Sequence, residues 1–206
     1  MIVRGNLGLT QRDVAFTLAA FGAGSILAAL TLPRILDRVA DRIIMVGAAA
    51  ALTVGLAVLA VLTASFGAAP VYWRMILIGW FILGIAYSMS VTPAGRLLRR
   101  SANADDRPAL FAAQFALSHC ACLICYPLVG LLGASIGQTA AFAAMAVISA
   151  VGTLAALWLW PSADPDKLAH DHADLAPDHP HLHGDHRNAR EHAFVIDDLH
   201  QHWPRQ

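Results

Sequence analysis

Five long apolar stretches occupy the first 160 residues of the chain and constrain its fold more than any other feature. A membrane-crossing helix needs about 20 largely apolar residues, and each stretch reaches that length. Composition agrees, because 57% of the 206 residues are hydrophobic and 14% are charged, whereas an average soluble domain has roughly 25% charged residues. The sequence therefore predicts an all-α, polytopic membrane helix bundle with spans at 14–35, 43–62, 71–91, 110–132 and 139–159.

The polarity changes near residue 160, which predicts a transmembrane domain at 1–160 and a His-rich tail at 161–206. The tail holds nine of the ten histidines and nine of the fourteen acidic residues. Its low apolar content is typical of a disordered segment, although the apolar residues after position 193 could dock on the bundle. Imidazole and carboxylate groups in such tracts bind Ni, Zn or Co. The candidate ligands are His170, His172, His179, His181, His183 and His186.

The arginines in the connections predict the orientation, because Lys and Arg gather on the cytoplasmic side. The connections at 34–42 and 92–109 contain seven Arg, and the opposite side has at most three. We therefore expect an outside N-terminus, a cytoplasmic tail and a location in the cell membrane, of the bacterial inner-membrane kind. The sequence has no strong basic block for nucleic acid and no P-loop, nucleophile elbow or zinc-protease helix, so we do not expect an enzyme.

The third and fourth spans differ from the others because they carry polar side chains. Polar groups inside a bilayer are costly and usually face a bundle interior or a wet cavity. These spans are therefore candidates to line a pathway, or their polar groups join helices by hydrogen bonds. His119 is ionisable, which suits proton coupling or metal transfer, or it is a neutral imidazole bonded to a neighbouring helix. The pathway-lining candidates are Tyr87, Ser88, Ser90, Gln114, Ser118, His119, Cys122 and Tyr126.

Three stretches resemble the C-terminal part of a major facilitator superfamily transporter, helices eight to twelve. They are LGLTQRDVAFTLAAFGAGSILAAL at 7–30, PRILDRVADR at 33–42 and RLLRRSANADDRPALFAAQFALSH at 96–119. The second is similar to the family's loop motif G-x-x-x-D-R-x-G-R-R: Asp37, Arg38 and Arg42 match it, whereas Pro33, Ala40 and Asp41 depart from it. The resemblance implies a cytoplasmic charge cluster of Asp37, Arg38 and Arg42. The alternative is a solvated loop that sets the topology.

The resemblance also implies a function. Complete members have two six-helix halves with the substrate bound between them. The chain is thus expected to be a C-terminal half or fragment of a transporter. It would move a small solute or a metal ion by alternating access coupled to an ion gradient. Its expected partners are the lipid bilayer and a missing N-terminal half, or a second copy.

A different class of function stays open. The chain would then be a membrane-anchored protein that binds divalent metal or a partner and does not transport. Ala20, Gly24 and Ala28 recur every four residues, and such small-residue stripes allow close helix association. No cofactor is expected with certainty beyond Ni, Zn or Co ions at the tail.

Overall fold

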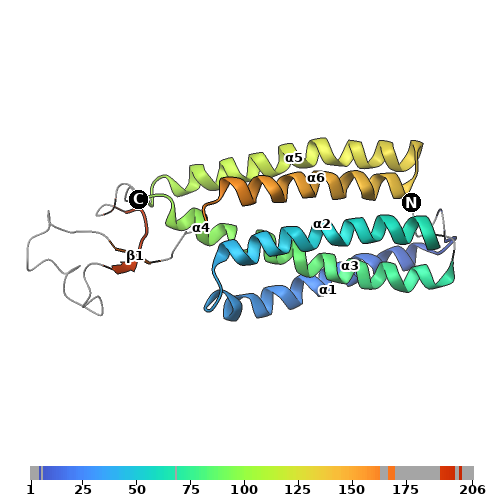
Figure 1. Ribbon diagram of the computed structural model, residues 1–206, viewed down its shortest axis with the longest axis horizontal. Coiled ribbons are helices and arrows are strands. Elements are labelled where there is room, and N and C mark those ends of the chain that lie inside the picture. Colours follow the sequence, from blue (N-terminus) through green and yellow to red (C-terminus); the bar gives the residue numbers. More distant parts are fainter. Residues whose placement is uncertain are drawn as a thin grey trace, which may run out of the picture.

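The computed structural model describes residues 5, 7–67, 69–162, 167–169, 191–197 and 200 (Figure 1). Within them, five segments are helical, long enough and apolar enough to cross a membrane. The prediction of an all-α membrane bundle is therefore confirmed. The elements are α1 (Gln11–Leu36), α2 (Asp41–Phe66), α3 (Pro70–Val91), α4 (Ala94–Arg100), α5 (Arg107–Ser135), α6 (Gln138–Leu159), β1 (Lys167–Ala169) and β2 (Glu191–Ala193).

Local signals define where several of these helices begin. At the start of α1, the backbone N–H of Thr10 donates to Oδ2 of Asp13 at 2.9 Å, which is half of a capping box. Helix α5 has Pro108 in its first turn, where its missing N–H costs nothing. The short helix α4 was not expected, because the sequence analysis treated 92–109 only as a charged connection. It positions three of the four arginines of this connection on one turn-and-a-half of helix.

Helix α1 packs closely along α3 because each presents a bare glycine to the other. A Cβ on Gly24 would lie 2.1 Å from the carbonyl oxygen of Phe81, and a Cβ on Gly84 would lie 2.1 Å from that of Phe21. Small residues at helix interfaces allow such close approach in membranes. Gly24 belongs to the predicted small-residue stripe of α1, so α3 of the same chain already covers the centre of that stripe.

The remaining long helices follow in the order α3, α2, α6 and α5, each packed against the next. In Figure 1, α5 and α6 run together along one side of the bundle, and α1 and α3 run along the other. Three hydroxyls join α2 to α6. Oγ1 of Thr53 lies 2.8 Å from Oγ of Ser149 and 3.4 Å from Oγ1 of Thr153. These three hydroxyls therefore meet one another instead of lipid.

The described parts of the tail are ordered in two places: a short strand pair, which the expected disorder of the tail did not include, and the apolar end, for which docking was expected. Strands β1 and β2 pair antiparallel, with Lys167 opposite Ala193. Beyond β2, Phe194 and Ile196 are buried, and the backbone N–H of Ile196 donates to the carbonyl oxygen of Arg100 at 3.0 Å. The apolar end of the tail thus docks in an extended form on α4. The six candidate metal-binding histidines of the tail lie outside the described residues.

Candidate pathway face and charge cluster

The polar side chains of α5 lie on a helix that packs against α6 near the α5–α6 turn and is open farther away. Every residue from Phe111 to Ala121 is exposed. Gln114, Ser118 and His119 therefore have no described helix covering them, and Cys122 is half-buried. The structure places these candidates on the surface of the described bundle and not in an enclosed channel.

Hydrogen bonds within α5 hold two of these side chains in place. The hydroxyl of Ser118 donates to the carbonyl oxygen of Gln114 at 2.8 Å. Nδ1 of His119 lies 2.8 Å from the carbonyl oxygen of Phe115, and the imidazole stacks on the Phe115 ring at 3.9 Å. Because a carbonyl oxygen only accepts, Nδ1 carries the proton in this contact and Nε2 presents its lone pair. The imidazole is therefore oriented with Nε2 as the atom that can accept a proton.

The candidates on α3 divide into two kinds. Tyr87 is 49% exposed, and its ring packs against Phe21 of α1 with a centroid separation of 5.7 Å. Tyr126 on α5 is 74% exposed and lies four residues after Cys122 on the same helix. Cys122 and Tyr126 therefore share one side of α5, whereas Tyr87 packs on α1.

The two serines of α3 take a different position. Oγ of Ser88 is 3.5 Å from Oγ1 of Thr92, and the hydroxyl of Ser90 donates to the carbonyl oxygen of Tyr87 at 2.9 Å. Ser88 is buried. Both serines satisfy their hydroxyls on their own helix. A polar contact between α1 and α3 was also not predicted: the hydroxyl of Ser25 on α1 donates to the carbonyl oxygen of Gly84 at 3.0 Å.

The predicted charge cluster is not assembled as expected, because its three members point to different surroundings. Asp37 and Arg38 are exposed where α1 ends, and neither forms a side-chain ion pair within the described residues. Arg42 instead reaches the C-terminal end of α6. Its Nε donates to the carbonyl oxygen of Trp160 at 3.0 Å, and a terminal nitrogen lies 3.4 Å from that of Leu157. A cation there is favoured by the negative end of the helix dipole.

The ion pair at this end of the bundle involves Asp41, a residue that departs from the family motif. Its carboxylate is 4% exposed and accepts from Nε and a terminal nitrogen of Arg96 on α4, at 3.0 and 2.6 Å. Asp41 is the first residue of α2, where a carboxylate is favoured by the helix dipole. Together, Asp41 and Arg42 connect the start of α2 to α4 and to the end of α6.

No metal centre is evident in the part of the chain that the structure describes. No three His, Cys, Asp or Glu residues within it are close enough to share an ion. Cys120 is exposed, whereas Cys122 and Cys125 are half-buried. Positions 120 and 122 point about 200° apart on a helix, so they do not form a chelating pair.

An apolar bundle of five spanning helices, with polar groups on one span and charged connections at one end, defines a multi-pass membrane protein. The comparison with protein families identifies which kind. The sequence model of the Major Facilitator Superfamily matches residues 1–195, and the chain belongs to this family. The comparisons with curated proteins and with solved structures gave no match.

Proposed function

We propose that the chain supplies the C-terminal helices of a secondary transporter, and that the open polar face of α5 lines the path of a small solute or metal ion. The observation that carries this proposal is the exposure of Gln114 and His119 inside a spanning helix. The side-chain amide of Gln114 has no partner within the described residues. A polar group in that position needs water or another polar segment beside it.

Gln114 and His119 lie far enough along α5 to be inside the hydrocarbon core of the bilayer. Gln114 and His119 lie seven and twelve residues after Arg107, the first residue of α5, which places them about 10 and 18 Å along the helix. The hydrocarbon core is about 30 Å thick. An amide placed in hydrocarbon without a hydrogen bond costs roughly 2–7 kcal/mol. Lipid contact at this face is therefore unfavourable, and a wet pathway or a polar partner helix avoids the cost.

His119 is the proposed proton-coupling group. Its orientation against Phe115 leaves Nε2 as the proton acceptor on the exposed side of α5. Uptake and release of a proton at Nε2 would alter the affinity of the pathway for a cation. This role accounts for an ionisable side chain in a span, where such groups are rare.

The contacts of Asp41 and Arg42 are proposed to close the end of the bundle that carries the Arg-rich connections. The Asp41–Arg96 pair joins α2 to α4, and residues 101–106 connect α4 to α5. A movement of α5 that carries α4 with it would strain or break the pair. The arrangement suits alternating access, in which helices around a fixed site rock between two states.

Transport and stand-alone metal binding are separated by flux measurements in energised membrane vesicles that contain the chain together with the N-terminal helices that complete the transporter. Vesicles would be offered Ni, Zn, Co and a panel of small solutes, with and without a collapsed proton gradient. The proposal predicts gradient-dependent flux of at least one compound and its loss in His119→Gln, but not in the tail variant His172→Gln. Saturable binding that ignores the gradient and disappears without residues 161–206 would favour the metal-binding function.

A further inference from the structure

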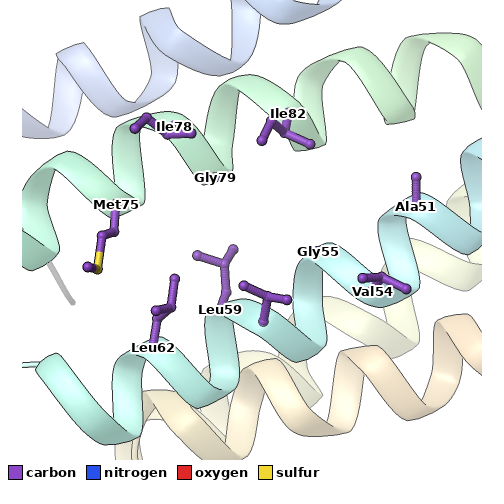
Figure 2. A pocket seen from close by; sticks show the side chains of 10 residues that line it. Ala51, Val54, Gly55, Leu59, Leu62, Met75, Ile78, Gly79 and Ile82 are labelled. Carbon is purple, nitrogen blue, oxygen red and sulfur yellow. The ribbon is translucent and has the colours of Figure 1, made fainter.

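A hydrocarbon-lined groove runs between α2 and α3 on the outer face of the bundle (Figure 2). It encloses about 430 Å³. None of its lining side chains contains nitrogen or oxygen, so it does not suit a polar transport substrate. We call it the α2–α3 groove, and its main lining residues are Val54, Val58, Leu62, Met75, Ile78 and Ile82.

The groove arises because α2 and α3 meet at two glycines and separate beside them. A Cβ on Gly55 would lie 2.8 Å from Cδ2 of Leu83, and a Cβ on Gly79 would lie 2.9 Å from Cδ2 of Leu59. These leucines fill the space over the glycines and are buried. The side chains beyond them do not close the surface. Val54, Ile78 and Ile82 stay 61%, 62% and 48% exposed.

A positively charged side chain, Arg74, lies at one end of the groove. Arg74 precedes Met75 directly and Ile78 by four residues, so it lies on the same helix row as Ile78 and Ile82. Its side chain is exposed and has no hydrogen bond or ion pair within the described residues. It is also the only Lys or Arg between positions 43 and 95.

The direction of helical side chains brings this cation to the bilayer surface. Side chains on a helix lean toward its N-terminus, and the N-terminus of α3 is the end at the α2–α3 connection. An Arg near a helix end extends its guanidinium to the interface, where phosphates lie. Arg74 therefore places a positive charge above an apolar groove that enters the membrane.

We propose that the α2–α3 groove and Arg74 together bind one phospholipid, with an acyl chain in the groove and the phosphate on the guanidinium. The dimensions agree with this occupant. Met75 and Ile82 are seven residues apart, which is about 10 Å along α3, and one leaflet contributes about 15 Å of hydrocarbon. Guanidinium groups bind phosphate with paired, charge-assisted hydrogen bonds. The binding site is separate from the proposed pathway face of α5 and does not depend on transport.

Photolabelling of the full chain in lipid nanodiscs tests the site. The nanodiscs would contain phosphatidylcholine and a small fraction of phosphatidylglycerol with a diazirine in its acyl chain, and labelled peptides would be identified by mass spectrometry. Label is expected on residues 54–62 and 75–82 in clear excess over α6. The matched reference surface on α6 is Val147, Val151 and Leu154, which are 63%, 62% and 64% exposed and so have equal access to bulk lipid.

Two variants separate a specific site from general lipid contact. Arg74→Gln should lower the labelling of the groove about tenfold, the effect of losing a charge-assisted hydrogen bond. Arg12→Gln, a change at an exposed Arg near the start of α1, should leave it unchanged. Val58→Trp, at a 48% exposed position, should displace the label by filling the groove. Circular dichroism and gel filtration would establish that each variant keeps its helices.

Three results would overturn the proposal. The first is equal labelling of the groove and of the α6 reference surface. The second is groove labelling that Arg74→Gln leaves intact. The third is crosslinking of the groove to a second copy of the chain by a photoreactive amino acid placed at Ile78, which would make that copy the occupant of the groove.

Discussion

Removing the guanidinium of Arg96 should destabilise the bundle more than neutralising Asp41, although the two residues share one ion pair. The Asp41 carboxylate is 4% exposed and accepts two hydrogen bonds, whereas Arg96 is 41% exposed. Breaking a fully buried pair costs roughly 3–5 kcal/mol, and the access of water to Arg96 reduces this. We expect about 2–3 kcal/mol for Arg96→Gln.

Asp41→Asn should cost only about 1 kcal/mol, because the amide oxygen still accepts a hydrogen bond and Arg96 can turn to water. The double variant should therefore show a coupling energy on the order of 1–2 kcal/mol. The matched control is Arg99→Gln on the same short helix. Nε of Arg99 donates only within α4, to the carbonyl oxygen of Gly95 at 3.1 Å, and this change should stay within about 0.5 kcal/mol of the parent.

The free energy of unfolding would be measured in mixed detergent micelles by tryptophan fluorescence, as a function of the fraction of denaturing detergent. The reasoning would be refuted by equal losses for Arg96→Gln and Arg99→Gln. It would be refuted equally by effects of Asp41→Asn and Arg96→Gln that add within about 0.5 kcal/mol.

Three further changes probe the packing. Gly84→Leu should separate α1 from α3, because its Cβ would lie 2.1 Å from a backbone oxygen. Gly22→Leu is the control, since a Cβ at Gly22 would have no atom within 4 Å. Disulfide trapping between α1 and α3 should fall only in Gly84→Leu, and equal trapping in both variants would contradict the close packing. Thr53→Val should lower the free energy of unfolding by about 0.6–1.7 kcal/mol, because it removes the hydroxyl contacts to α6. Unfolding in detergent measures this, and an unchanged free energy would mean that these contacts do not stabilise the bundle. Phe194→Ala should release the end of the tail from α4 and speed its cleavage by added protease, and an unchanged cleavage rate would argue against docking.

The spanning helices were predictable because the signal for them is local. About 20 consecutive apolar residues are enough to indicate a span, and the polar side chains of the third and fourth spans were visible in the same way. The contacts between spans were not predictable. Thr53 and Ser149 are 96 residues apart, and nothing in either helix indicates that their hydroxyls face one another.

The pairing of the charged residues was also not predictable from the sequence. The family motif directed attention to Asp37, because that residue matches it. The side chain that becomes buried is Asp41, and the break between α1 and α2 decides this. Arg96 was counted only as a topological charge, since the short helix α4 that positions it was not expected. A sequence shows which charges are available, but their pairing depends on where the connecting backbone turns.

The short strands of the tail were likewise not predictable from the sequence. Strands β1 and β2 have three residues each and are separated by more than 20 positions. Segments so short carry no recognisable alternation. The docking of Phe194 and Ile196 was easier to anticipate, because these apolar residues stand in a polar tail. Its extended form was not predictable, since it depends on the hydrogen bond to the Arg100 carbonyl.

The central claim is that one face of α5 meets water inside the membrane, and thiol accessibility tests it most directly. A charged, membrane-impermeant thiol reagent would be applied to native membranes. Each variant would carry one cysteine, with the remaining native cysteines changed to Ala. The test positions are Gln114→Cys, Ser118→Cys and native Cys122, and the controls are Ala116→Cys and Leu123→Cys.

The two control positions are exposed in the structure, with Leu123 75% exposed, but they point about 140–160° away from Ser118. The account predicts that positions 114, 118 and 122 react and that positions 116 and 123 do not, because only the first group faces water. Equal reaction around the helix, or none at positions 114 and 118, would contradict the proposed pathway.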